Sequence, residues 1–203
     1  MDSKTIKESI ANWEAIRQNS VQVTKFFEQG NTFAYSFPAY ASTSGSIHAY
    51  PGIHNNILYF FLIPSAYDKQ EYSDVIDQYT SVCLVVHPIG GGGGHEISSL
   101  VAKERIANWD KNYHDWVPVQ INSTFGMYEA FCISTEDFEV EKVTVSFALK
   151  ASPAAEVNFQ ADLIITNDKG KQVVYDDFVE PVPPFGLTDE LANENFYLLQ
   201  EFN

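Results

Sequence analysis

The chain contains one heptapeptide twice, as Lys7-Glu8-Ser9-Ile10-Ala11-Asn12-Trp13 and as Lys103-Glu104-Arg105-Ile106-Ala107-Asn108-Trp109, with six of seven residues identical at an offset of 96. Similarity at a fixed offset indicates an internal repeat. In both occurrences apolar residues recur at helical spacing and end in a tryptophan, which we expect to anchor the core. The heptapeptide therefore predicts two helices that open two equivalent units.

Apolar residues continue in phase at the same offset beyond the heptapeptide. Phe33, Tyr35 and Phe37 fall on Glu129, Phe131 and Ile133; Ile47, Ala49 and Ile53 fall on Val143, Val145 and Leu149; Pro88 and Gly90 fall on Pro184 and Gly186. Between these anchors the register slips by about six residues, as hairpin loops of different length would produce. The sequence thus predicts a tandem duplication, with unit 1 over 1–90, a Gly-rich junction over 91–96, unit 2 over 97–186 and a C-terminal helix over 187–203.

Each unit is predicted to form a helix followed by antiparallel strands, which makes the fold class α+β. Period-2 alternation predicts half-buried strands at 33–37 and 143–149, and short apolar runs predict interior strands at Ile57–Ile63 and Val82–Val86. Asn167-Asp168-Lys169-Gly170 is typical of a hairpin turn. We expect the two units to pack with pseudo-two-fold symmetry; two separate small domains are the alternative.

Composition limits the partners. With 45% hydrophobic and 19% charged residues, 203 residues can bury a substantial core. The formal net charge of -15 disfavours nucleic acid and anionic membrane surfaces as partners. The N-terminal residues lack the pattern of a signal peptide and no apolar run is long enough to span a bilayer, so the sequence predicts a cytoplasmic protein. It fixes no oligomeric state.

A glycine tract, Gly90 to Gly94, lies between a predicted strand and a predicted helix. Its backbone amides could form an anion site made of Gly90, Gly91, Gly92, Gly93 and Gly94. The tract lacks the Lys and Ser/Thr of a phosphate loop and runs instead into His95 and Glu96. We favour a linker between the units over an anion site.

His87 and His95 flank the glycine tract and are the candidate metal ligands, although their spacing matches no known ligand signature. At the offset of 96 no histidine and no cysteine is shared between the two units. Core residues were retained while chemistry-bearing residues were not, which predicts no cofactor and no catalytic residue common to both units. Cys83 and Cys132 are expected to be buried free thiols.

Acidic and aromatic residues offer further candidates. Residues 91–203 carry 19 acidic and 7 basic residues, net -12, against 8 and 5, net -3, in residues 1–90. The acidic residues cluster at Glu136, Asp137, Glu139 and Glu141 and at Asp176, Asp177 and Glu180, where a solvated surface is expected because the EF-hand pattern is missing. Tyr40, Tyr50 and Tyr67 are candidates for an aromatic ligand surface in loops of unit 1.

The chain resembles a group of small uncharacterised bacterial proteins with no assigned activity. The resemblance lies in the Asn-Trp helix and in four segments: FAYSFPA (33–39), IHAYPGI (47–53), LYFFLIP (58–64) and VYDDFVEPVPP (174–184). In that group cysteines commonly surround the prolines of the last segment, where this chain has Val182 and Phe185-Gly186. The resemblance implies no activity and covers about half of each unit.

The sequence favours a non-catalytic binding or protein-interaction module with a possible protein partner for its acidic half. The alternative is a metal-dependent or phosphate-binding enzyme with a single-copy site near Gly90–Gly94. An enzyme is expected to gather titratable residues with perturbed pKa values in a pocket, whereas an interaction module is expected to expose an apolar or aromatic patch.

Overall fold

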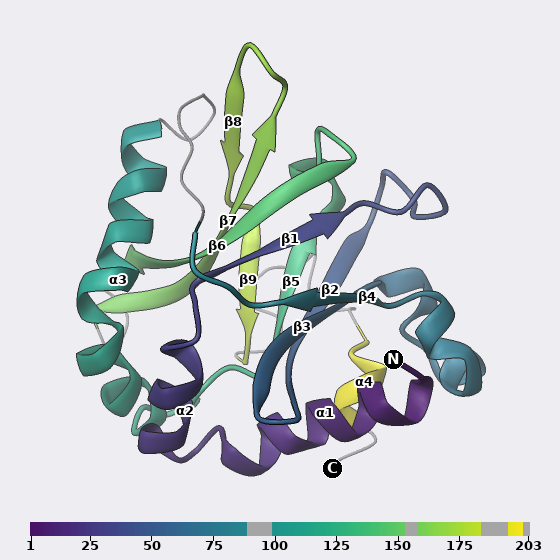
Figure 1. The fold of residues 1–203 in the computed structure, drawn as a ribbon, viewed down its shortest axis with the longest axis horizontal. Helices are drawn as coiled ribbons and strands as arrows, with labels where there is room; N and C mark the ends of the chain where they lie inside the picture. Colours follow the sequence, from purple (N-terminus) through teal and green to yellow (C-terminus); the bar gives the residue numbers. More distant parts are fainter. Residues whose placement is uncertain (89–98, 153–157, 184–194, 201–203) are drawn as a thin grey trace.

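The computed structural model describes residues 1–88, 99–152, 158–183 and 195–200 and shows an α+β fold built on two antiparallel sheets (Figure 1). Sheet A has the strand order β1-β6-β7-β8 and sheet B the order β4-β3-β2-β5-β9. The strands are β1 Thr32–Ser36, β2 Ser46–His54, β3 Ile57–Pro64, β4 Ser81–Leu84, β5 Ala130–Ser134, β6 Lys142–Ala151, β7 Phe159–Asp168, β8 Val173–Asp176 and β9 Val179–Val182. The helices are α1 Ser3–Ile16, α2 Ser20–Phe27, α3 Ser99–Ile121 and α4 Tyr197–Gln200, with 3-10 turns η1 Ser65–Tyr67, η2 Gln70–Gln78 and η3 Thr135–Asp137.

The main core lies between the sheets, because alternate strand positions from both sheets belong to one buried cluster. Phe33 on β1 stacks on Phe60 of β3, with ring centroids 4.8 Å apart, so side chains of the two sheets meet directly. Both heptapeptide tryptophans, Trp13 and Trp109, lie in this cluster with at most 2% exposure. Their predicted role as core anchors is confirmed.

Each sheet has a second, outer face that a helix covers. Helix α1 packs on β2 of sheet B, with Ile6 and Ile10 in an outer cluster that also holds Phe61. Gly52 of β2 makes this approach possible, since a Cβ there would lie 2.5 Å from the Phe61 ring and 3.0 Å from the Ser9 carbonyl carbon. Helix α3 packs on β6 of sheet A. The outer faces are therefore occupied in the same manner.

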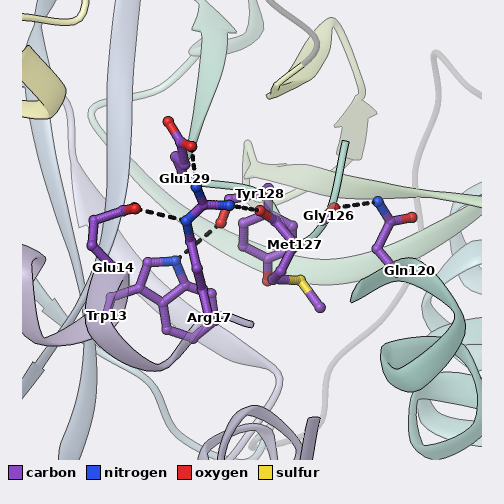
Figure 2. Close-up of polar contacts among 8 residues, drawn as sticks. All are labelled: Trp13, Glu14, Arg17, Gln120, Gly126, Met127, Tyr128 and Glu129. Atoms are coloured by element: carbon purple, nitrogen blue, oxygen red, sulfur yellow. Dashed lines mark hydrogen bonds and ion pairs between the residues drawn. The ribbon is translucent and has the colours of Figure 1, made fainter. Parts of the chain in front are cut away.

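Figure 2 shows how the C-terminal half of α1 is attached to the segment that precedes β5. The Trp13 indole Nε1 donates to the Tyr128 carbonyl at 3.0 Å. Arg17 donates to the Met127 carbonyl at 2.8 Å and pairs with the carboxylates of Glu14 and Glu129. Burial raises the pKa of Glu14, against the opposing effect of Arg17. The contacts of Trp13 and Arg17 with residues 127–129 link positions more than a hundred residues apart.

Two strands pair across the predicted boundary between units. β1 lies beside β6 in sheet A, with Tyr35 opposite Val143, and β5 lies beside β2 in sheet B, with Ile133 opposite Ile47. The first strand of each half therefore completes the sheet formed mainly by the other half. The two halves share one core, in place of the two separate small domains considered above.

The predicted hairpin at Asn167–Gly170 is confirmed, since it joins β7 to β8 with Gly170 at φ 80°. The prediction of an interior strand at Val82–Val86 is wrong. β4 is the edge strand of sheet B, and its outward side chains Val82 and Leu84 are 38% and 46% exposed. Hydrophobicity alone does not tell whether a strand has one neighbour or two.

Candidate functional site

An open cavity of about 240 Å³ lies where the start of β7 meets the β8–β9 connection. Its polar lining includes the carboxylates of Asp162 and Asp177 and the ammonium group of Lys150, and its apolar lining includes Phe178. The remaining lining residues are Gln160, Ala161, Val179 and Glu180. Strand β9 is an edge of sheet B, so this site borders the open side of the sheet.

Arg105 on α3 holds two of the cavity carboxylates. Its Nη1 donates to Asp162 Oδ2 at 2.9 Å and also to Asp177 Oδ2. Lys150 lies 3.7 Å from the same Asp177 oxygen. Burial raises the pKa of Asp162 to about 7, although Arg105 opposes the shift. Asp162 is therefore a carboxyl group whose charge changes near neutral pH.

A further acidic side chain joins this region from η3. Burial raises the pKa of Asp137 to about 8, and the neighbouring carboxylates of Asp176 and Asp177 add to the rise. Asn167 connects the two predicted acidic clusters, because its side-chain amide donates to the Asp137 carbonyl at 2.7 Å and to Asp176 Oδ2 at 2.9 Å. Asp137 lies near the cavity but does not line it. The prediction that Asp137 is solvated is wrong, since it is 5% exposed.

Phe178 is the exposed aromatic member of the site, with 59% of its surface accessible. It follows Asp176 and Asp177 in the connection between two edge strands. An aromatic ring beside several carboxylates suits a cationic group, because a cation gains from the ring face as well as from the charges. The site therefore combines an exposed aromatic side chain with carboxylates, two of which are paired with Arg105 and one of these also with Lys150.

A second polar cluster is fully buried on the outer face of sheet B. Asp68 Oδ2 lies 2.6 Å from His48 Nδ1 and accepts the Tyr50 hydroxyl hydrogen bond, while Asp68 Oδ1 accepts from the Leu198 N–H at 3.2 Å. His48, Tyr50 and Asp68 are all 0% exposed. Phe196 covers the cluster by stacking on the His48 ring at 4.0 Å. This cluster joins the C-terminal segment to the sheet.

Tyrosines gather near η1 and η2. Tyr67 and Tyr79 stack at 4.1 Å, and Tyr40 and Tyr72 meet both rings edge-on at 5.2 to 5.8 Å. Ligand binding by Tyr40 and Tyr67 stays a prediction. The expectation that the tyrosines lie at the surface holds for Tyr40, which is 46% exposed, and for half-buried Tyr67. It is wrong for Tyr50, which lies in β2 with 0% exposure, because an apolar strand and not a loop carries it.

Of the metal and anion candidates predicted from the sequence, the structure describes only one. Gly90, Gly91, Gly92, Gly93, Gly94 and His95 lie outside the described residues, whereas His87 is described and exposed. Among the described ranges, no three His, Cys, Asp or Glu side chains are placed to hold a metal ion. Cys83 and Cys132 are buried and free, as predicted. The enzyme near Gly90–Gly94 stays a prediction.

Sequence reasoning missed the Asp162–Arg105 pair and the His48–Asp68 pair. Their partners are 57 and 20 residues apart, so no local motif joins them. A signal was present in each case: Asp162 and His48 interrupt otherwise apolar strands, in QADLII and SIHAY. A polar side chain at an interior strand position needs a buried partner, which marks it for attention.

Comparison of the chain with protein-family models, with curated proteins and with solved structures returns no match. Within the part of the chain that the structure describes, no helix is both long and apolar enough to cross a membrane.

Proposed function

We propose that the chain is a non-catalytic interaction module that binds a basic segment of a partner protein at the acidic cavity. The observation that carries this proposal is the placement of Asp162, Asp177 and Glu180 around one cavity beside the exposed Phe178. A lysine or arginine side chain of the partner supplies the complementary charge. Charge-assisted hydrogen bonds and an exposed aromatic contact are typical of the residues that dominate interface energies.

The charge distribution supports a basic partner. The formal net charge is -15, and 19 of the 27 acidic residues lie in residues 91–203, where the cavity is. Such a surface repels phosphate backbones and attracts cationic segments from a distance. Nucleic acid therefore stays excluded from the proposal. The buried free thiols Cys83 and Cys132 fit the cytoplasmic location expected from the sequence.

Binding of an arginine-rich peptide tests this function, with a glutamate-rich peptide of equal length as the negative control. Removal of Phe178 by Phe178→Ala is expected to weaken binding by about fivefold or more, the loss of one aromatic–cation contact of roughly 1 kcal/mol. Phe125→Ala is the matched control, because Phe125 is also exposed, at 52%, and does not line the cavity. Equal affinity in both variants, or no binding, contradicts the proposal.

The pH dependence sharpens the same test. A bound cation favours the ionised form of Asp162, whose pKa is about 7 in the free protein. Affinity for the peptide is therefore expected to rise as the pH increases from 6 to 8, and protons are released on binding. The rise should disappear in Asp162→Asn. Isothermal titration in two buffers of different ionisation enthalpy measures the proton release.

We also infer that the two halves arose by tandem duplication and pack with pseudo-two-fold symmetry. Reciprocal strand pairing supports this, because Tyr35 pairs with Val143 and Ile133 pairs with Ile47. Ile133 stands 98 positions after Tyr35, and Val143 stands 96 positions after Ile47. The other β1–β6 pairs from Ser36 to Phe33 follow the same rule. In each sheet, the first strand of one half thus pairs with the second strand of the other half.

Two further positions support the duplication. Ala148 of β6 stands at the offset of 96 from Gly52 of β2, and each is a small buried residue on the face that its helix covers. The exchange of first strands predicts that residues 1–96 and 97–203, produced separately, do not fold alone but assemble when mixed. Circular dichroism of each half and of the mixture checks this. Independent folding of either half contradicts the inferred exchange.

A further inference from the structure

The C-terminal segment Asn195–Gln200, which we call the strap, packs on the outer face of sheet B. Phe196, Tyr197, Leu198 and Leu199 are consecutive and all at most 9% exposed. They belong to the same buried cluster as Ile6 and Ile10 of α1 and Cys132 of β5. Helix α4 within the strap has four residues, which is too short to be stable alone. Its order therefore depends on docking.

The surface beneath the strap is polar at its centre. Phe196 stacks on His48, and the Leu198 N–H donates to Asp68, whose other oxygen meets His48 and Tyr50. Such groups are readily hydrated, so water can replace the strap's hydrogen bond when the segment leaves. Hydration of the carboxylate offsets part of the lost apolar burial.

The strap is also topologically separable. Both sheets have their complete strand order without it, and the described part of the strap forms no strand pair. Figure 1 shows α4 beside α1 at the outer side of the sheets. Its departure leaves the hydrogen-bond ladders of both sheets in place. Local openings of this kind occur at lower free energy than global unfolding.

We propose that the strap is a detachable intramolecular ligand: it leaves while both sheets stay folded, and it uncovers a docking surface centred on His48, Tyr50 and Asp68. The occupant of that surface in the alternative state is a partner segment with the same Phe-Tyr-Leu-Leu chemistry as the strap. The strap itself shows that this surface accepts such a segment. This site is separate from the acidic cavity, and the inference does not depend on the proposed function.

The two cysteines provide a matched pair of reporters. Cys132 lies opposite His48 on the face under the strap and is 4% exposed; Cys83 lies in the main core and is 5% exposed. Each thiol is measured alone, in Cys83→Ala and in Cys132→Ala, by reaction with an aromatic disulfide reagent. The protein thiolate attacks the reagent, forms a mixed disulfide and releases a coloured thiolate. Rates are normalised to those of the unfolded chain in denaturant.

Opening of the strap is expected to make Cys132 react at least about tenfold faster than Cys83 in native buffer, with a weaker dependence on denaturant, as local openings require. Phe196→Ala should raise the Cys132 rate by about tenfold or more and leave the Cys83 rate within about threefold. A Cys132 rate whose denaturant dependence equals that of global unfolding overturns the proposal, because the strap then leaves only on global unfolding. The comparison of Cys132 with Cys83 labelling uses chains with the natural strap, so it stays valid if Phe196→Ala fails to fold.

The docking surface is tested with a synthetic peptide of residues 192–203. In the chain that carries Cys83→Ala and Phe196→Ala, a saturating amount of the peptide should slow Cys132 labelling by about fivefold or more, since it occupies the surface in place of the weakened strap. The same peptide with Phe196→Ala is the control and should have no effect. Absence of protection by the natural peptide overturns the docking part of the proposal. If the double variant does not fold, protection is measured in the Cys83→Ala chain at higher peptide concentration.

Discussion

The outer faces of the two sheets are covered in the same way but filled with different side chains. On sheet B, α1 and the strap enclose a cluster of large residues that includes Phe61, Ile63 and Ile76. On sheet A, α3 covers a small cluster made of Ala102, Ala148, Ile164 and Tyr175, and beside it lies the carboxylate site of Asp162. Two sheets that are covered in the same way therefore differ in what their outer faces contain. Ala102 and Ala148 give the sheet A cluster smaller side chains, and the second half carries most of the acidic residues.

Truncation of the sheet B cluster is expected to have the largest effect. Phe61 is 0% exposed in β3, so Phe61→Ala should lower the free energy of unfolding by about 3–5 kcal/mol through lost burial and a cavity. Ile164→Ala on sheet A should cost less, about 2–3 kcal/mol, because the alanines around Ile164 offer fewer contacts to lose. Urea unfolding measures both. A larger loss for Ile164→Ala would reverse the comparison.

The carboxylates of the second half predict a pH dependence of stability. The folded-state pKa of Asp162 is raised to about 7 and that of Asp137 to about 8, so the folded chain binds more protons than the unfolded chain. Their contribution to stability is present at pH 4 and is lost as the pH rises to 8. Asp162→Asn should reduce the loss of unfolding free energy between pH 4 and pH 8 by roughly 2–4 kcal/mol. Exposed Asp74→Asn in η2 is the control and should leave the slope unchanged.

The two heptapeptide tryptophans sharpen the comparison at equivalent sequence positions. Trp13 Nε1 donates to the Tyr128 carbonyl, whereas the described residues give Trp109 Nε1 no hydrogen-bond acceptor. Trp13→Phe leaves that buried carbonyl without its donor and should cost about 1–2 kcal/mol more than Trp109→Phe. Thermal and urea unfolding of the two variants check the difference. Equal losses would mean that the hydrogen bond at Trp13 contributes nothing.

The tyrosine group of the first half should give the smallest effect. Tyr40 is 46% exposed and meets Tyr67 and Tyr79 edge-on, so Tyr40→Ala removes two ring contacts at the surface. The expected loss is about 0.5–1.5 kcal/mol. Exposed Phe125→Ala serves as the matched control, with an expected change below about 0.5 kcal/mol. A loss of unfolding free energy larger than that of Ile164→Ala would show that the tyrosine contacts stabilise the fold as much as core residues do.

The local sequence pattern correctly predicted features that depend on a single helix or strand. The heptapeptide located α1 and α3 and their buried tryptophans, and the apolar run 57–63 located β3. Helix α2 and the 3-10 turn η2 were missed, because eight and nine residues contain only two to three turns and neither segment is repeated at the offset of 96. The edge position of β4 was missed because a run of apolar residues does not state how many neighbours a strand has.

The α+β class, the two tryptophan helices and the alternation of buried and exposed positions in β1 and β6 follow from the sequence alone, because they depend on neighbours a few residues apart. Tertiary structure alone decided which strands share a sheet, that β1 pairs with β6, and that Arg105 meets Asp162 and Asp177. The physical reason is that pKa values and buried pairs depend on distance through space and on exclusion of water. Distances through space and the exclusion of water are set by the folded structure and cannot be read from the order of residues along the chain.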